Sequence, residues 1–366
     1  MRILFIPINR YNLKSNEHIP NRIRMLSQKN EVLGVELQGP PYIGVETPKG
    51  LAKSLYYGLK VFSFGLRRRK DYDLIFCWEP FYSIVGLCIA LLCGKPCIRD
   101  SAIVTRHHYL QMRTFKAKVT TIIASITEKT LFKCLKMMIV LSEADKKAYI
   151  EMGFKSDKVV VIPLPAGFQF SDEVTAEKDV LRKKLCYDKD KKILIFTGNR
   201  GYPPNIRASC WINDELAPAI SSKFGDAQIL FTGSGAIPKQ VHPIATFTGF
   251  VPNYFEHLQA ADIVIAPLQP KSGVLVKILD AMSCSKPMII MTEAAAGFPE
   301  LIDGYNVMIA KDKVEFIEKA LYLLEHPEEA KQMGVKARET MERYYAPKIW
   351  EEKLSEVLEE CLIKDK

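Results

Sequence analysis

Lys277 and Asp280 are the charged residues of a segment, Val274 to Met282, that is otherwise almost wholly apolar. They lie three residues apart, so a helix would place them on one face. An apolar helix is usually buried, and buried charges need a ligand or a partner. A lysine there suits a phosphate, and an aspartate suits a pair of vicinal hydroxyls. An ordinary salt bridge on a solvated helix face is the alternative interpretation.

The residues before this pair suggest a seat for an anion. A strand-like run ends at Ala266, a proline-bounded loop follows, and we expect a helix to begin near Ser272 and Gly273. Ser272 would cap this helix. The bare backbone at Gly273 would leave N–H groups and the positive end of the helix dipole open to a phosphate.

A repeated tripeptide marks a second set of candidate ligand contacts. Phe-Thr-Gly occurs three times, each time closing a strand-like run, so that the chain turns at Gly198, Gly233 and Gly249. A glycine at such a turn allows close approach of a ligand to the backbone, although a single copy would be ordinary turn chemistry. Three copies within one domain favour a ligand lying across the edge of a sheet.

Short β-branched runs that alternate with helical patterns are the elements that position these residues. The alternation is typical of parallel strands joined by crossover helices, and such sheets bind ligands at the carboxyl ends of their strands. We therefore expect two doubly wound α/β domains. The expected strands are 2–8, 31–37, 72–78, 96–100, 137–142 and 159–163 in the first half, and 193–196, 228–231, 245–247, 262–265 and 288–291 in the second.

The length of 366 residues also predicts two domains, because one hydrophobic core rarely organises so long a chain. Turn-forming and charged residues from 163 to 190 place the boundary near residue 168. The expected first domain is 1–168, the second is 169–345, and a helix in 346–366 crosses back to the first.

The net charge of +9 is unevenly distributed, with +13 over residues 1–170 and −4 over residues 171–366. Residues 67–70 are all basic, and 106–136 contain seven basic residues against one acid, Glu128. A nucleic-acid partner is disfavoured, because the residues between these charges are mainly aliphatic rather than aromatic. A helix of this kind either packs on its own domain or docks on an anionic membrane surface.

The absence of characteristic motifs disfavours several other classes of protein. The sequence has neither a phosphate loop of the ATPase type nor a complete dinucleotide fingerprint, and it has no zinc-peptidase or serine-hydrolase motif. Its nine cysteines lack metal-binding spacing, and we expect reduced core residues. The longest apolar run, Phe81 to Cys93, is shorter than a membrane-spanning helix. No secretory pattern opens the sequence, so a cytoplasmic location is expected.

One block of the chain resembles the donor half of retaining glycosyltransferases of the GT-B fold, family four, also called glycosyltransferase group 1. Weaker similarity extends over nearly the whole chain. The residues that carry the resemblance are Thr248–Val251, Leu258–Asp262, Pro267–Leu268, Gly273, Lys277–Met282, Lys286–Pro287 and Glu300–Asn306.

The resemblance implies transfer of a sugar from a nucleoside-diphosphate sugar to an acceptor, with retention of anomeric configuration. It implies roles for individual residues in donor binding. Phe250 and Val251 would contact the base, Ser272, Gly273 and Val274 the diphosphate, Lys277 a phosphate oxygen, and Asp280 the ribose hydroxyls, with Gly198 and Gly233 in the floor of the site.

The resemblance implies catalytic roles for two cationic residues and for a histidine. Arg200 would join Lys277 in stabilising the leaving diphosphate, so that neither a metal nor a cofactor is expected. His107 or His108 would face the anomeric centre, or the two are solvent-exposed loop residues.

The sequence departs from the family pattern at two of these places. The family's paired glutamates, eight residues apart, fall at Ser272 and Asp280, so one is missing and the other is shortened. The family's lysine five residues after the arginine is also absent, and Arg207 either substitutes for it or faces solvent.

The basic first half suggests that the acceptor is lipid-linked or a glycan, and that the protein is peripheral on the cytosolic face of an anionic membrane. Two alternatives remain open: a GT-B sugar-nucleotide epimerase, and a nucleotide-sugar-binding protein without transferase activity.

Overall fold

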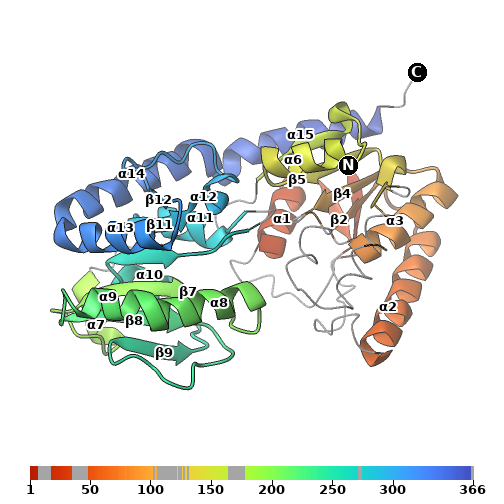
Figure 1. Cartoon of the computed structure of the whole chain (residues 1–366). Coiled ribbons are helices and arrows are strands. Elements are labelled where there is room, and N and C mark those ends of the chain that lie inside the picture. Colours follow the sequence, from red (N-terminus) through yellow and green to blue (C-terminus); the bar gives the residue numbers. More distant parts are fainter. Residues whose placement is uncertain are drawn as a thin grey trace. The chain divides into compact units, whose positions relative to one another are not determined.

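The computed structural model describes residues 1–6, 18–34, 48–78, 80–101, 104, 122, 126, 128, 129, 132–163, 178–270 and 274–363. The chain forms two units (Figure 1). The first comprises Met1–Pro165, Lys271–Val274 and Pro347–Lys366, and the second comprises Ala166–Pro270 and Leu275–Ala346. Each unit contains a six-stranded parallel sheet flanked by helices.

The sheet of the first unit has the order β2-β1-β3-β4-β5-β6. Strands β3 and β5 are short apolar runs that are buried throughout, and β1 is buried after Arg2, as expected for a parallel sheet covered on both faces. The strands are β1 (Arg2–Ile6), β2 (Glu31–Leu33), β3 (Leu74–Cys77), β4 (Cys97–Ser101), β5 (Met137–Val140) and β6 (Val159–Val161). The helices are α1 (His18–Ser27), α2 (Pro48–Arg67), α3 (Pro80–Cys93), α6 (Glu143–Glu151) and α15 (Pro347–Leu362), with short 3-10 turns η1 (Phe132–Cys134) and η2 (Ser156–Lys158).

The C-terminal helix α15 belongs to the first unit although it ends the chain. Its buried residues Leu354, Val357 and Leu358 share one apolar core with Ile3 and Phe5 of β1. The predicted return of this helix to the first domain is therefore confirmed.

The sheet of the second unit has the order β12-β11-β10-β7-β8-β9. Its strands are β7 (Lys192–Thr197), β8 (Ala227–Thr232), β9 (Ala245–Gly249), β10 (Ile263–Ala266), β11 (Met288–Met291) and β12 (Met308–Ala310). Its helices are α7 (Lys178–Lys184), α8 (Pro203–Trp211), α9 (Ala217–Ser221), α10 (Tyr254–Ala260), α11 (Val276–Ser283), α12 (Thr292–Ala295), α13 (Lys313–Glu325) and α14 (Pro327–Tyr345), and a π-helical turn, η4 (Ile212–Leu216), joins α8 to α9.

The strand order of the second sheet reverses at β7. Strand β8 follows β7 on one side, and β10 lies on the other. The carboxyl ends of β7 and β10 thus flank a topological switch point, which is where open α/β sheets bind their ligands. The residues that follow these two strands are therefore the first to inspect for a site.

All eleven predicted strands are present, and the prediction of two doubly wound domains is confirmed. The twelfth, β12, was missed because its three residues are too few to show a period. The interpretation of the cysteines as core residues was only partly right. All nine thiols are unpaired, but those of Cys88, Cys134 and Cys186 are exposed. Among the described helices, none is long and apolar enough to cross a membrane.

Candidate functional site

Three glycines line the carboxyl edge of the second sheet, as the repeated tripeptide predicts. Gly198, Gly233 and Gly249 all have positive φ angles, of 151°, 108° and 73°. A Cβ atom at Gly233 would lie 2.4 Å from the carbonyl oxygen of Gly198. The close approach at Gly233 is thus to the neighbouring strand end, and it keeps the edge free of side chains.

The phenylalanines of the three tripeptides form a ladder across β7, β8 and β9. Phe196 pairs in register with Phe231, and Phe231 with Phe247. Their ring centroids are 6.1 and 4.3 Å apart. The two predicted cations contact opposite ends of this ladder: the Lys277 ammonium lies 4.5 Å from the Phe196 centroid, and the Arg200 guanidinium 5.0 Å from that of Phe247. The aromatic faces hold both cations near the edge.

Lys277 lies at the switch point. It occupies the first turn of α11, and its Nζ donates a hydrogen bond of 2.5 Å to the carbonyl oxygen of Thr197, the last residue of β7. Burial lowers the pKa of Lys277 to about 7, although the nearby Asp280 carboxylate opposes this shift. An ammonium in this environment gains most from an anion that replaces the carbonyl as its partner.

Arg200 follows Gly198 and is fixed by the loop after β8. Its backbone N–H donates to the Ser234 carbonyl oxygen at 2.7 Å, and its Nε to the Ala236 carbonyl oxygen at 2.9 Å. The residue is only 1% exposed, and within the described part of the chain its Nη1 has no hydrogen-bond partner. Burial lowers the pKa of the guanidinium, which nevertheless remains charged at neutral pH. A buried donor without a partner is costly unless a ligand accepts from it.

Asp280 is buried on α11, where its charge acts on Lys277 and raises the pKa of that lysine. The Tyr254 hydroxyl, at the start of α10, donates a hydrogen bond to Oδ2 of Asp280. Burial, and then the Asp280 charge, raise the pKa of Tyr254 well above its ordinary value, so the hydroxyl stays protonated. Lys277 and Asp280 thus share a helix face, and the hydrogen bonds described here connect this face to β7 and to α10.

The start of α11 differs from the prediction. The helix begins at Val276, and its N-cap, Leu275, makes no side-chain capping bond. Ser272 therefore does not cap it, and Gly273 does not lie in its first turn; both residues lie outside the described part of the chain. The half-buried Val274 precedes the helix. The N–H groups of the first turn of α11 are consequently those of Val276 and the residues after it.

The predicted base contacts follow β9 directly. The Phe250 side chain is 76% exposed, and Val251 is half-buried. An exposed aromatic ring at a strand end can stack on a nucleobase. The histidines predicted to face the anomeric centre, His107 and His108, lie outside the described residues.

Two residues that sequence reasoning missed shape the site. Tyr254 gives no signal, since a tyrosine after a proline-bounded turn is ordinary. Asn205 donates from its Nδ2 to the Asn199 carbonyl oxygen at 2.8 Å and packs over Gly198, which ties the Arg200 loop to α8. The two prolines at the start of α8 hint at this arrangement. Arg207 is exposed on α8, so it faces solvent.

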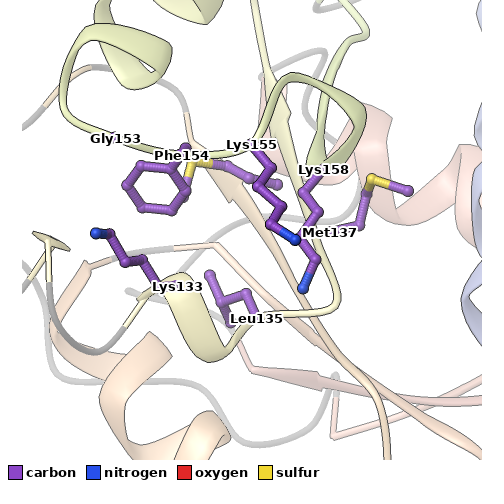
Figure 2. A pocket seen from close by; sticks show the side chains of 8 residues that line it. Lys133, Leu135, Met137, Gly153, Phe154, Lys155 and Lys158 are labelled. Atoms are coloured by element: carbon purple, nitrogen blue, oxygen red, sulfur yellow. The ribbon is translucent and has the colours of Figure 1, made fainter.

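Two cavities lie at the amino ends of the sheets, away from this edge. One, of 220 Å³ in the first unit, is lined by Lys133, Lys155 and Lys158 over an apolar floor that includes Leu135 and Phe154 (Figure 2). The other, of 590 Å³, adjoins the first residues of β7, β10 and β11. Among the described residues, no cluster of three histidine, cysteine or carboxylate side chains could hold a metal ion.

Residues 191–326, which contain both cations and Asp280, match the family described as Glycosyl transferases group 1. The resemblance to the group 1 glycosyltransferases is confirmed. A trehalose synthase of Pyrococcus horikoshii is 34% identical over 87 residues, which are 24% of this chain and 21% of that protein. A GDP-mannose-dependent monoacylated alpha-(1-6)-phosphatidylinositol monomannoside mannosyltransferase of Corynebacterium glutamicum is 26% identical over 216 residues, which are 54% of this chain and 55% of that protein.

The chain therefore spans about half, or less, of the length of these curated relatives. Similarity of fold extends much further. The crystal structure of HepE from Anabaena in complex with UDP-glucose covers 98% of this chain and 100% of its own, with a TM-score of 0.70 and 14% sequence identity. The GT-B fold predicted from the sequence is confirmed.

Proposed function

We propose that the chain is a glycosyltransferase that binds a nucleoside-diphosphate sugar at the carboxyl edge of the second sheet and transfers its sugar with retention of configuration. The observation that carries this proposal is that two cations, Lys277 and Arg200, both lie at this edge, at the two ends of the phenylalanine ladder. Lys277 contacts the end of β7 at the switch point, and Arg200 has a buried donor without a partner in the described chain. The family match and the UDP-glucose complex of HepE support the donor class.

The arrangement suits departure of a diphosphate. Breaking the bond between sugar and phosphate builds negative charge on the diphosphate, which Lys277 and Arg200 stabilise. The N-terminus of α11 adds a partial positive charge. Removing one preorganised donor of this kind typically raises a barrier by about 2.7–4 kcal/mol. On the sugar-nucleotide side, Phe250 stacks on the base and Asp280 accepts from the ribose hydroxyls.

The acceptor belongs to the first unit in this proposal, and it is lipid-linked or a glycan presented at an anionic membrane. Helix α2 supplies a described surface for docking. Leu55, Tyr56 and Leu59 are 51%, 74% and 68% exposed, and they lie between the exposed Lys53 and Lys60. Four basic residues, 67–70, follow and are exposed. Apolar side chains flanked by lysines suit a membrane interface with anionic headgroups.

Co-sedimentation with vesicles tests the membrane part. We expect recovery with phosphatidylglycerol vesicles to exceed recovery with phosphatidylcholine vesicles at low salt. The triple variant Leu55→Ser/Tyr56→Ser/Leu59→Ser should lose most of this binding, whereas Val314→Ser/Val335→Ser, on exposed positions of the second unit, should keep it. Equal recovery with neutral and anionic vesicles would exclude this docking mode.

Turnover with a panel of UDP-, GDP- and ADP-sugars tests the reaction class. Released nucleoside diphosphate together with a glycosylated acceptor from a lipid extract supports the transferase. A nucleotide sugar with an inverted carbon indicates an epimerase, and binding without any turnover indicates a binding protein. Either of the last two results contradicts the proposed reaction while leaving the donor site intact.

A further inference from the structure

The cavity of the first unit combines an apolar floor with a cationic rim. Its volume is 220 Å³, and it lies beside the first residues of β5, between the turn η1 and the loop that joins α6 to β6 (Figure 2). Among the described residues that line it, every polar side chain is a lysine and none is a carboxylate. The cavity therefore offers two kinds of contact, one apolar and one positively charged.

The floor is a fixed part of the core of the first unit. It consists of Leu135, Met137, Met138 and Phe154, all of which are buried. The ring of Phe154 also packs edge-on against that of Tyr149, with the centroids 5.4 Å apart. Side chains that are close-packed from below do not collapse into the cavity, so the floor is preformed for contact with an apolar group.

The rim carries three ammonium groups, those of Lys133, Lys155 and Lys158. Figure 2 shows Lys133 on one side of Leu135 and the other two lysines on the other side. The Lys133 ammonium lies over Gly153, 3.5 Å from the position that a Cβ atom there would take. Within the described part of the chain, none of the three lysines forms an ion pair. Their charge is thus available to an anion.

The floor and the rim together favour one class of ligand. An inorganic anion would use only the rim, and a hydrocarbon would use only the floor. A phosphate monoester carries about 1.5 to 2 negative charges at pH 7 and three acceptor oxygens, which suits three lysines. The volume is below the roughly 300–1,000 Å³ of sites for drug-sized ligands, so the apolar part that enters is short.

We propose that this cavity binds a phosphate monoester of a short apolar group, with the phosphate at the three lysines and the apolar group on the floor. A soluble metabolite and the headgroup end of a lipid both have this chemistry, and the experiments below distinguish them. The site belongs to the first unit, whereas the proposed donor site belongs to the second. The inference consequently does not depend on the proposed function.

Calorimetric titration with methyl, butyl and hexyl phosphate tests the two kinds of contact without altering the protein. Inorganic phosphate and hexanol represent the rim and the floor alone. We expect hexyl phosphate to bind at least about tenfold more tightly than either of them. Affinity should rise by up to about fourfold for each added methylene until the cavity is filled. Equal affinities for methyl and hexyl phosphate would overturn the proposal.

A triple variant tests the rim. Lys133→Gln/Lys155→Gln/Lys158→Gln should weaken hexyl phosphate binding at least about tenfold. The matched control is Lys29→Gln/Lys129→Gln/Lys147→Gln, which removes the same charge at exposed positions of the first unit that do not line the cavity. It should weaken binding less than about twofold. Equal losses in both variants would show a general attraction of anions to the basic unit and would overturn the site.

Competition locates the site and identifies the source of the ester. Saturating UDP should leave the affinity for hexyl phosphate unchanged, and displacement by UDP would assign the ester to the donor site instead. If hexyl phosphate releases the chain from vesicles that contain phosphatidic acid, the ligand is a lipid headgroup. If it binds but does not release the chain, the ligand is a soluble ester. A chain that binds UDP but not hexyl phosphate would overturn this inference while the proposed function stands.

Discussion

The ammonium of Lys277 donates a hydrogen bond to the carbonyl oxygen of Thr197, across 80 positions of the sequence. The contact joins the first turn of α11, which follows β10, to the end of β7, and so it lies where the order of the second sheet reverses. A backbone carbonyl is a weak partner for a half-buried cation. A diphosphate at this edge would replace a neutral acceptor with an anionic one.

The pH dependence of nucleotide binding should report on Lys277. Its pKa of about 7 means that it is largely neutral in the free protein above pH 8, whereas a bound diphosphate favours the charged form. Binding then takes up a proton, so affinity falls as pH rises. We expect the Kd for a nucleoside diphosphate to rise roughly tenfold between pH 7 and pH 8.5. Titration calorimetry in buffers of different ionisation enthalpy measures both the affinity and the proton uptake.

Lys277→Arg is the control for this pH effect, because a guanidinium stays charged throughout the range. The nucleotide affinity of this variant should not change with pH over this range, whatever its absolute value. Parallel profiles in the wild type and this variant would assign the pH dependence to another group.

Arg200 should contribute more to diphosphate binding than its neighbour on α8. Replacing it with glutamine removes a charged donor that is already desolvated, and we expect a loss of about 10- to 100-fold in affinity. Arg207→Gln, at an exposed position, should change affinity by less than about twofold. Fluorescence competition with a labelled nucleotide compares the two, and similar losses in both variants would argue against a specific role for Arg200.

Phe250 should act through the base alone. Its side chain is mostly exposed, so Phe250→Ala should leave the melting temperature nearly unchanged. Loss of base stacking should weaken nucleoside diphosphate binding about 5- to 50-fold, and Phe250→Trp should restore it. Inorganic pyrophosphate, which has no base, should bind both variants as it binds the wild type. A loss of pyrophosphate affinity in Phe250→Ala would contradict stacking as its role.

The glycines of the carboxyl edge should differ in their tolerance of a methyl group. At Gly249 only the positive φ opposes alanine, which costs about 1–2 kcal/mol. At Gly233 the methyl group would also lie 2.4 Å from the carbonyl oxygen of Gly198, so the backbone at one of these two strand ends would have to shift. Urea unfolding should show Gly233→Ala to be at least about twice as destabilising as Gly249→Ala. The reverse order would mean that the strand ends do not pack as described.

The strands could be predicted from the sequence because each buried strand of a parallel sheet is a short run rich in β-branched residues, which is visible without knowledge of its neighbours. The local pattern also identified Lys277 and Asp280 as candidate site residues, but it did not indicate which residues they contact. These contacts are with Thr197 of β7 and Tyr254 of α10. The sequence pattern of α11 alone cannot predict contacts with residues of other elements.

The start of α11 was misplaced for a related reason. Ser272 and Gly273 have the types expected of a helix start, yet the helix begins only at Val276, after an extended Leu275 without a capping bond. Local capping preferences are worth about 1 kcal/mol, which burial of the apolar residues of α11, a helix that packs on α14, easily exceeds.

Calorimetric titration of the purified chain with UDP, GDP and ADP tests the central claim most directly, together with the variants Lys277→Met, Arg200→Gln and Asp280→Asn. The account predicts that at least one of the nucleotides binds, and that each substitution weakens this binding at least about tenfold while the protein remains folded. Failure of all three nucleotides to bind, or a nucleotide affinity that none of the three substitutions changes, would contradict a donor site at the carboxyl edge of the second sheet.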